Sequence, residues 1–329
     1  MKEINSVLRA DNIAIGVVGL GLMGSSIAVD LLLAGHKVKA IAPIREDYLM
    51  GAERIGNNLA HAAEFGLLAQ PVQYYYSRLT ISEDYQELQD CRMVTECVIE
   101  KSHIKNAVYK KIEGAVDHET IITSNTSAIP ISVLQKMACH PKRFMGIHWA
   151  EPAYATRFLE IIPGECTDPQ NVRWVLQLAR LWKKEPILLK KDIRGFITNR
   201  LMYSVYREAF NLITSGIASF EEVDKAFRYD AGSWITLMGI FRRMDFIGLH
   251  DFEAIFSAIF PDLSNSETVP PLMEEMIAAD ARGVHNAKGL YQYTEEEAKA
   301  WSDAYALFNK DIYHLAEAYA QSKIDFVNS

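Results

Sequence analysis

The stretch Ile13-Ala14-Ile15-Gly16-Val17-Val18-Gly19-Leu20-Gly21-Leu22-Met23-Gly24-Ser25-Ser26-Ile27-Ala28 decides the fold. An apolar run typical of a buried strand enters a Gly-x-Gly-x-x-Gly motif, and a helical pattern leaves it. The first glycine suits a tight turn, the second lets a pyrophosphate approach the backbone, and the third lets the helix pack close to the strand. The pattern predicts a dinucleotide-binding turn, with phosphates near Gly19, Gly21, Leu22, Met23 and Gly24.

A flexible turn, a membrane helix or a signal sequence are the alternative interpretations of this apolar stretch. Asp30 interrupts the apolar run, and no basic segment with a small-residue cleavage site precedes it. We therefore favour the dinucleotide interpretation.

Length and charge limit the class of protein. The 329 residues suffice for two domains, and the net charge of −8, from 34 basic and 42 acidic residues, disfavours a nucleic-acid partner. The four cysteines have no metal-site spacing, so we expect no metal and reduced thiols. With no export or anchoring signal in view, we expect a cytoplasmic protein that makes no membrane contact.

The end of the second predicted strand, residues 36–42, bears on the choice of cofactor. An NAD-binding fold usually has an acidic residue there for the ribose hydroxyls, but this chain has Ala42 followed by Pro43. Arg45 could contact a 2'-phosphate and favour NADP, or it could be a solvated arginine at a helix start. Glu46 and Asp47 could instead support NAD, so both nucleotides stay open.

Several polar residues fall at the ends of later predicted strands. Glu100 ends the predicted strand 93–100, where open α/β sheets bind ligands, and Lys105 follows in the next helix. Ser127 lies in a polar turn and would alone be a helix cap more often than a catalytic group. His148 ends one strand and Glu160 lies inside the next, where a buried carboxylate needs a partner. Such a pair forms a general base, because the carboxylate orients the ring and stabilises its charged form.

Five ordered motifs together resemble the L-3-hydroxyacyl-CoA dehydrogenase family, in the short form that includes 3-hydroxybutyryl-CoA dehydrogenase and the L-gulonate dehydrogenase or lambda-crystallin branch. They cover most of the chain: Gly19-x-Gly21-x-x-Gly24, Glu96-x-x-x-Glu100, Ser124-Asn125-Thr126-Ser127, His148 to Glu160, and Gly195-Phe196-Ile197-Thr198-Asn199-Arg200-Leu201. The resemblance implies that Ser127 binds the substrate oxygen, His148 is the base, Glu160 its partner, and Asn199 a substrate-orienting amide. It also places Glu100 and Lys105 near the nicotinamide and the substrate.

The chain departs from the family pattern beside the expected base. The family's His-x-x-Asn-Pro is here His148-Trp149-Ala150-Glu151-Pro152, so a second titratable group replaces a neutral amide. Glu151 could bind a differently polar substrate, pair with Arg157 or face solvent. Arg157 keeps a positive charge where relatives carry one, which is compatible with an anionic substrate or with a plain surface arginine.

The pattern becomes helical from about residue 190, where we place the domain boundary. We predict a doubly wound Rossmann-type α/β domain over 1–189 and an all-helical domain over 190–329, with the active site between them. Helices are expected over 199–215, 236–248 and 295–323, with a capping box at Ser219 and a loop over 229–234. By resemblance, the helical domain makes a homodimer, whereas the apolar stripes alone would equally fit an intrachain core.

The predicted reaction is hydride transfer between a nicotinamide cofactor and a small-molecule substrate, a short-chain 3-hydroxyacyl-CoA and its 3-oxo form. A free 3-hydroxy acid, as in the gulonate branch, is the alternative substrate. A nicotinamide-binding protein without turnover is the non-enzymatic alternative.

Overall fold

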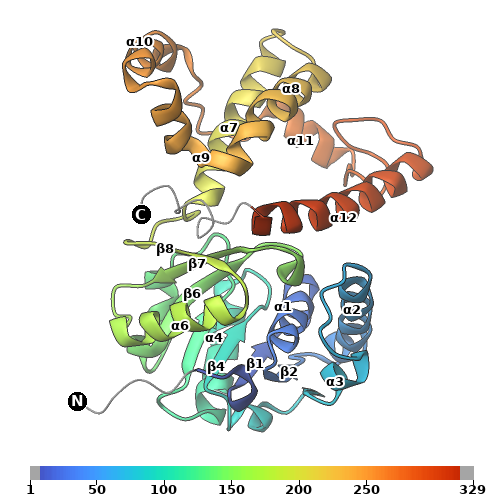
Figure 1. Ribbon diagram of the computed structural model, residues 1–329, viewed down its shortest axis with the longest axis vertical. Helices are drawn as coiled ribbons and strands as arrows, with labels where there is room; N and C mark the ends of the chain where they lie inside the picture. The colour runs from blue at the N-terminus through green and yellow to red at the C-terminus, as the bar shows by residue number, and fades with distance from the viewer. Residues whose placement is uncertain (1–7, 319–329) are drawn as a thin grey trace. The chain divides into compact units, whose positions relative to one another are not determined.

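The computed structural model describes residues 8–318, apart from the side chains of residues 302, 306 and 316–318. The chain divides into two compact units between Asn199 and Arg200. The sequence placed a boundary ten residues earlier, at 189/190, where the strand pattern stops. Figure 1 shows a sheet with flanking helices in the first unit and helices alone in the second.

The first unit contains an eight-stranded sheet in the order β3-β2-β1-β4-β5-β6-β7-β8. Each neighbouring pair is parallel except β6 and β7, which are antiparallel. The strands are β1 (Ala14–Val18), β2 (Lys37–Ile41), β3 (Leu79–Ser82), β4 (Met93–Glu96), β5 (Ile121–Ser124), β6 (Phe144–Trp149), β7 (Phe158–Pro163) and β8 (Glu185–Leu188). The predicted Rossmann-type fold is confirmed, and β8 is a strand that the sequence analysis did not identify.

Helices cover both faces of this sheet. Side chains of α1, α2 and α6 belong to one buried cluster, and those of α4 and α5 belong to the other. The helices are α1 (Leu22–Leu33), α2 (Arg45–Glu64), α3 (Val72–Tyr76), α4 (Ser102–Ala115), α5 (Ile131–Gln135) and α6 (Pro169–Leu181). Short 3-10 turns are η1 (Ala10–Asn12), η2 (Tyr85–Leu88), η3 (Pro141–Arg143) and η4 (Ala153–Ala155).

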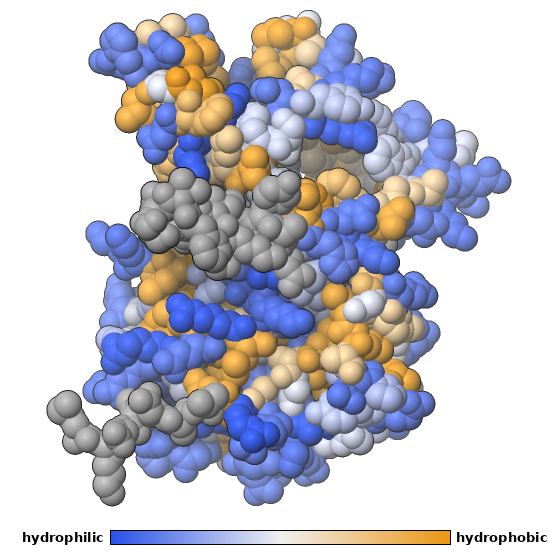
Figure 2. All heavy atoms as spheres, viewed as in Figure 1, coloured by the Kyte–Doolittle hydropathy of each residue, from blue (hydrophilic) through white to orange (hydrophobic). Residues whose placement is uncertain are grey.

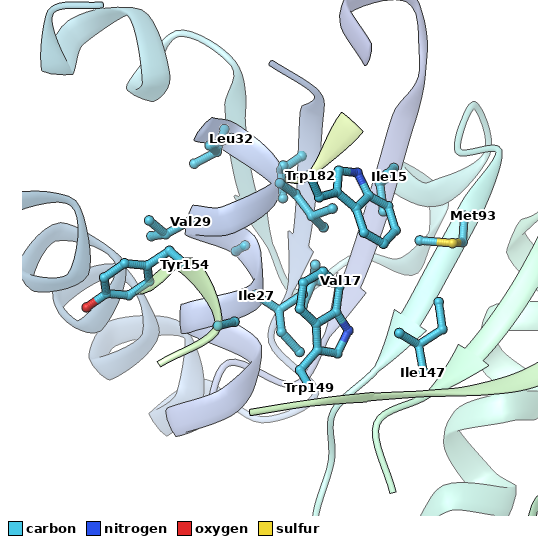
Figure 3. Close-up of a cluster of buried hydrophobic side chains, with 14 of the residues drawn as sticks. Ile15, Val17, Ile27, Val29, Leu32, Met93, Ile147, Trp149, Tyr154 and Trp182 are labelled. Carbon is cyan, nitrogen blue, oxygen red and sulfur yellow. The ribbon is translucent and has the colours of Figure 1, made fainter. Parts of the chain in front are cut away.

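Two tryptophans anchor the first cluster beneath the strand that enters the glycine turn. The Trp149 and Trp182 rings stack with their centres 5.2 Å apart, near Ile15 and Val17 of β1 (Figure 3). Both indoles are almost fully buried. Because Trp149 directly follows His148, this packing fixes the end of β6 that carries the histidine.

Asp30, which interrupts the apolar run of the first helix, has a buried partner. Its Oδ1 lies 2.8 Å from Nζ of Lys184, whose side chain is 1% exposed. The same ammonium donates to the carbonyls of Ala153 and Thr156 at 2.5 and 2.6 Å. Burial raises the pKa of Asp30 to about 6, although Lys184 opposes this shift. The pair ties α1 to the segment between β6 and β7.

The second unit is helical. Its helices are α7 (Thr198–Thr214, which begins in the first unit), α8 (Phe220–Ala226), α9 (Gly232–Ile247), α10 (Leu249–Ile259), α11 (Pro271–Ala278) and α12 (Glu295–Ala318), with a π-turn at η5 (Phe227–Ala231) and a 3-10 turn at η6 (Phe260–Asp262). The capping box of Ser219 and Glu222 is confirmed. The loop predicted over 229–234 is wrong, because Gly232 has helical torsion angles (φ −58°, ψ −32°) and the chain continues as a helix. Residues 319–323 of the predicted last helix lie outside the described residues.

The second unit leaves large apolar side chains at its surface. Among the described side chains from 200 to 318, only Ala298 is buried. Phe241, Phe246 and Leu249 are 79%, 70% and 62% exposed, and Figure 2 shows apolar residues gathered over α10. Across residues 8–318, no helix combines the length and the apolar character that a membrane crossing requires.

Candidate active site

His148 and Glu160 face each other across the antiparallel pair β6 and β7. They are direct partners in the strand register, and His148 Nδ1 lies 2.8 Å from Glu160 Oε2. The other carboxylate oxygen accepts the backbone N–H groups of Ile197 and Thr198, each at 3.0 Å. Burial alone raises the pKa of Glu160, but these hydrogen bonds outweigh it and hold the pKa below its ordinary value. Glu160 is therefore ionised, and both of its carboxylate oxygens have hydrogen-bond partners.

Ser127 completes a chain of three polar side chains. Its Oγ lies 3.2 Å from His148 Nε2, and the imidazole contacts the rings of Phe158 and Phe196, with ring centres 5.8 and 5.4 Å away. Because an ionised carboxylate can only accept, Nδ1 on the Glu160 side of the ring carries a proton, and in the neutral ring Nε2 then has the lone pair. His148 is only 8% exposed, and its Nε2 contacts the Ser127 hydroxyl.

Asn199 joins the same cluster from the start of α7. Its Nδ2 donates to the carbonyl oxygen of Ser127 at 3.3 Å. The structure thus brings together Ser127, His148, Glu160 and Asn199, and all four lie in the first unit.

Glu100 lies beside this cluster and holds the turn that carries Ser127. The strand predicted to reach Glu100 ends at Glu96, because the carboxylate of Glu96 accepts the backbone N–H of Val98 and turns the chain. Glu100 accepts hydrogen bonds from the Thr126 hydroxyl and from the N–H of Ala128. Burial raises the pKa of Glu100, but the Thr126 hydrogen bond and the Lys105 charge lower it by more, so the pKa lies below its ordinary value.

A buried polar network that was not predicted from the sequence surrounds Glu96. Lys105 Nζ lies 2.7 Å from Glu96 and 3.2 Å from Glu100, and its side chain is 1% exposed. Glu96 also accepts the hydroxyls of Tyr109 and Ser124, both at 2.7 Å. Lys105 and Tyr109 are four residues apart and share one face of α4, and this spacing, with a carboxylate inside an apolar strand, was the available signal. Lys105 is thus positioned by two carboxylates.

The glycine turn has the shape that a dinucleotide requires. A side chain at Gly24 would overlap the carbonyl oxygen of Gly19, whereas the space beside Gly21 is open. No side chain caps the N-terminus of α1, where Leu22 and Met23 are the first two residues. Free N–H groups at a helix N-terminus bind a pyrophosphate well, so the glycine turn and the start of α1 fit a dinucleotide. Arg54 of α2 donates to the carbonyl of Leu20 at 3.0 Å and fixes the turn, a contact that the sequence analysis did not foresee.

Arg45 has a partner at the place where the strand-end acid is missing. Ala42 is buried, and Arg45 Nη1 lies 2.6 Å from Oε1 of Glu83, which follows β3. The sequence alone does not predict that Glu83 meets Arg45, because β3 lies beside β2 only in the tertiary structure.

The two residues predicted near the substrate are placed differently from each other. Arg157 pairs with Glu185 of β8, with Nη2 2.9 Å from Oε1, and its side chain is 15% exposed. Glu151 follows β6 and is exposed. The structure leaves Glu151 at the surface near the base and ties Arg157 to the edge of the sheet.

Comparison with known proteins shows which family the chain belongs to. The model of the 3-hydroxyacyl-CoA dehydrogenase NAD-binding domain matches residues 14–193, and that of the 3-hydroxyacyl-CoA dehydrogenase C-terminal domain matches residues 195–293. The chain is 32% identical over 289 residues to 5-formyl-3-hydroxy-2-methylpyridine 4-carboxylate 5-dehydrogenase of Mesorhizobium japonicum, covering 87% of this chain and 92% of the relative. It is 30% identical to a probable 3-hydroxybutyryl-CoA dehydrogenase of Deinococcus radiodurans, covering 84% and 99%.

Solved structures agree with the sequence matches. The crystal structure of the same kind of pyridine-carboxylic acid 5-dehydrogenase, described as an NAD+-dependent dismutase, superposes with a TM-score of 0.86 at 30% identity, covering 92% of this chain and 98% of that one. The (S)-3-hydroxybutyryl-CoA dehydrogenase of Ralstonia eutropha gives a TM-score of 0.71 at 27% identity, covering 85% and 99%. The resemblance carried by the sequence motifs is confirmed: the chain is an oxidoreductase with a nicotinamide-nucleotide domain, and it belongs to the 3-hydroxyacyl-CoA dehydrogenase family.

Proposed function

We propose that this protein interconverts a hydroxyl and a carbonyl group with NAD, and that His148 is the general base. The observation that carries the proposal is the chain of contacts from Ser127 through His148 to Glu160. A bound nicotinamide nucleotide supplies the hydride acceptor for this oxidation. His148 Nε2 takes the hydroxyl proton, and Glu160 stabilises the imidazolium that results.

The remaining residues of the cluster orient the reacting group. Ser127 Oγ lies beside Nε2 and is placed to share a hydrogen bond with the substrate oxygen. Asn199 holds the backbone of Ser127, and its amide can also contact a substrate carbonyl. Glu100 and Lys105 support the same turn from the other side through Thr126. In the reverse direction, His148 returns the proton to the alkoxide oxygen.

A short-chain 3-hydroxyacyl-CoA is the first substrate candidate. It is supported by the two family models and by relatives named as 3-hydroxybutyryl-CoA dehydrogenases. A CoA-free carboxylated substrate is the second candidate, whether a free 3-hydroxy acid or a pyridine carboxylate. The relative at 32% identity and the structure with a TM-score of 0.86 favour this second class. Glu151, in place of the family's asparagine, and Arg157 are the residues that we expect to distinguish the two classes.

A substrate panel separates these candidates. Purified protein is assayed with acetoacetyl-CoA and NADH. It is also assayed with NAD and 3-hydroxybutyrate, L-gulonate or 5-formyl-3-hydroxy-2-methylpyridine 4-carboxylate, whose aldehyde adds water to give the hydroxyl that is oxidised. The highest kcat/KM with acetoacetyl-CoA would support the thioester, and the highest kcat/KM with a free acid would support the second class. The Arg157→Ala variant should raise the KM of a carboxylated substrate more than that of acetoacetyl-CoA.

The proposed base is tested by His148→Gln, with His118→Gln as a matched control. A positioned general base contributes about 10² to 10⁴ in rate, so His148→Gln should lose most turnover while still binding NADH. His118 is exposed and lies in the turn before β5, so its variant should keep the wild-type rate. A kcat of His148→Gln within about threefold of wild type would remove His148 from the mechanism, because that loss is below what a base contributes.

We also propose that the second unit forms a homodimer. Exposed apolar side chains on a monomer mark association surfaces, and those of α9 and α10 are abundant among the described residues. Sedimentation equilibrium should give twice the mass of one chain for the wild type and a shift toward one chain for Phe241→Glu. A wild-type protein that sediments as a monomer would contradict the dimer.

A further inference from the structure

Strand β3, which pairs with β2, is followed by the carboxylate of Glu83 at the level where β2 is followed by Ala42. Ile41 and Ser82 are partners in the parallel register, and the N–H of Ala42 donates to the carbonyl of Ser82 at 2.9 Å. Ala42 and Glu83 therefore leave the sheet side by side, about 4.8 Å apart as neighbouring strands are. The acid that usually ends β2 is absent, and Glu83 occupies the adjacent strand end.

Arg45, the residue that could bind a 2'-phosphate, is already engaged. Its guanidinium lies 2.6 Å from Glu83 and stacks over the Tyr48 ring, with 5.1 Å between the guanidinium carbon and the ring centre. Arg45 is the first residue of α2, and Glu83 is 44% exposed, so both groups remain accessible to a ligand. The pair has no net charge.

We propose that Glu83 sets the preference of this protein for NAD over NADP, an inference that rests on the proposed nucleotide site at the β1–α1 turn. A carboxylate accepts hydrogen bonds from ribose hydroxyls and repels a phosphate at the same position. Arg45 alone would attract a 2'-phosphate, but the Glu83 charge neutralises it. The discriminating acid has thus moved from the end of β2 to the end of β3.

The size of the effect follows from one unit of charge. Two charges about 4 Å apart interact by roughly 1 kcal/mol even in water, and a phosphate monoester carries nearly two charges at neutral pH. Replacing Glu83 by glutamine removes the repulsion and releases Arg45. We expect the affinity for NADPH relative to NADH to rise about tenfold at low salt, and the gain to shrink as salt screens the exposed groups.

The test is a titration of the full-length protein with NADH and with NADPH, followed by energy transfer from tryptophan to the reduced nicotinamide. The variants are Glu83→Gln, Arg45→Ala and their combination, with Glu119→Gln as a matched control. Glu119 is exposed and lies before β5, at the amino ends of the strands. Wild type should bind NADH more tightly, Glu83→Gln should gain NADPH affinity, and Arg45→Ala in that background should cancel the gain.

Two results would overturn the inference alone, namely tighter NADPH binding by wild type or an unchanged affinity ratio in Glu83→Gln. If wild type binds neither nucleotide, the proposed function fails together with the inference. Circular dichroism shows whether each variant is folded, and because both side chains are exposed we expect unaltered spectra.

Discussion

Replacing Glu160 by glutamine keeps the shape of the site and changes the proton position on His148. The glutamine oxygen can still accept the N–H groups of Ile197 and Thr198, which turns its NH2 group toward Nδ1 of His148. Nδ1 then accepts a hydrogen bond, and the ring proton moves to Nε2. Nε2 no longer has a lone pair for the substrate proton. The substitution therefore disables the base without removing it.

The magnitude follows from the part that a base plays in the rate. General-base catalysis contributes about 10² to 10⁴, and the equivalent carboxylate-to-amide change in a serine protease triad costs about 10⁴ through the same tautomer change. We expect kcat of Glu160→Gln to fall by roughly 10³ to 10⁴. Hydrogen bonds to a charged group are stronger than neutral ones, so the free energy of unfolding should fall by about 1–2 kcal/mol.

The assay combines turnover, nucleotide binding and unfolding on the same preparation. Steady-state kcat is measured with the best substrate of the panel, NADH affinity by tryptophan energy transfer, and stability by urea unfolding. The Glu119→Gln variant controls for the loss of a carboxylate charge, because that side chain is 70% exposed. A folded Glu160→Gln protein with normal NADH affinity and less than about a tenfold loss in kcat would refute the reasoning, since a wrong tautomer must cost far more.

The remaining predictions concern the nucleotide turn, the buried ion pair and acid stability. Gly24→Ala should lose NADH binding in titration, because the new side chain overlaps Gly19. Gly114→Ala, with open space beside it in α4, should bind NADH normally, and its free energy of unfolding should rise by about 0.5–1 kcal/mol. Lys184→Met leaves Asp30 buried without its cation and should lower the free energy of urea unfolding by about 3–5 kcal/mol at pH 7. An unchanged midpoint would show that the Asp30–Lys184 pair does not stabilise the fold. The Glu160 carboxyl has a folded-state pKa below its ordinary 4.5, so its stabilisation is present above that value and disappears as pH falls through the lower one. Urea unfolding from pH 7 down to pH 3 should therefore show the gap between wild type and Glu160→Gln closing below pH 4.5, and a constant gap would show that the pKa is not lowered.

Local patterns predicted the elements that carry the chemistry. The glycine turn, the strand that carries His148 and the capping box at Ser219 each depend on a few adjacent residues, and the structure has them. The ends of the predicted strands and helices were less accurate. The strand before Glu100 ends four residues earlier than predicted because the Glu96 carboxylate accepts the backbone N–H of Val98. The chain stays helical through 229–234 because Gly232 has helical torsion angles, whereas Gly239 does not and kinks α9.

The sequence by itself determined the Rossmann-type class and the pairing of His148 with Glu160, because a buried carboxylate on the strand that follows a histidine has few other partners. Only the tertiary structure decided which distant residues meet. Lys184 reaches Asp30 across about 150 residues of chain. Glu83 lies against Arg45 because β3 pairs with β2, and a parallel register between strands is set by packing and crossover connections that no local pattern encodes.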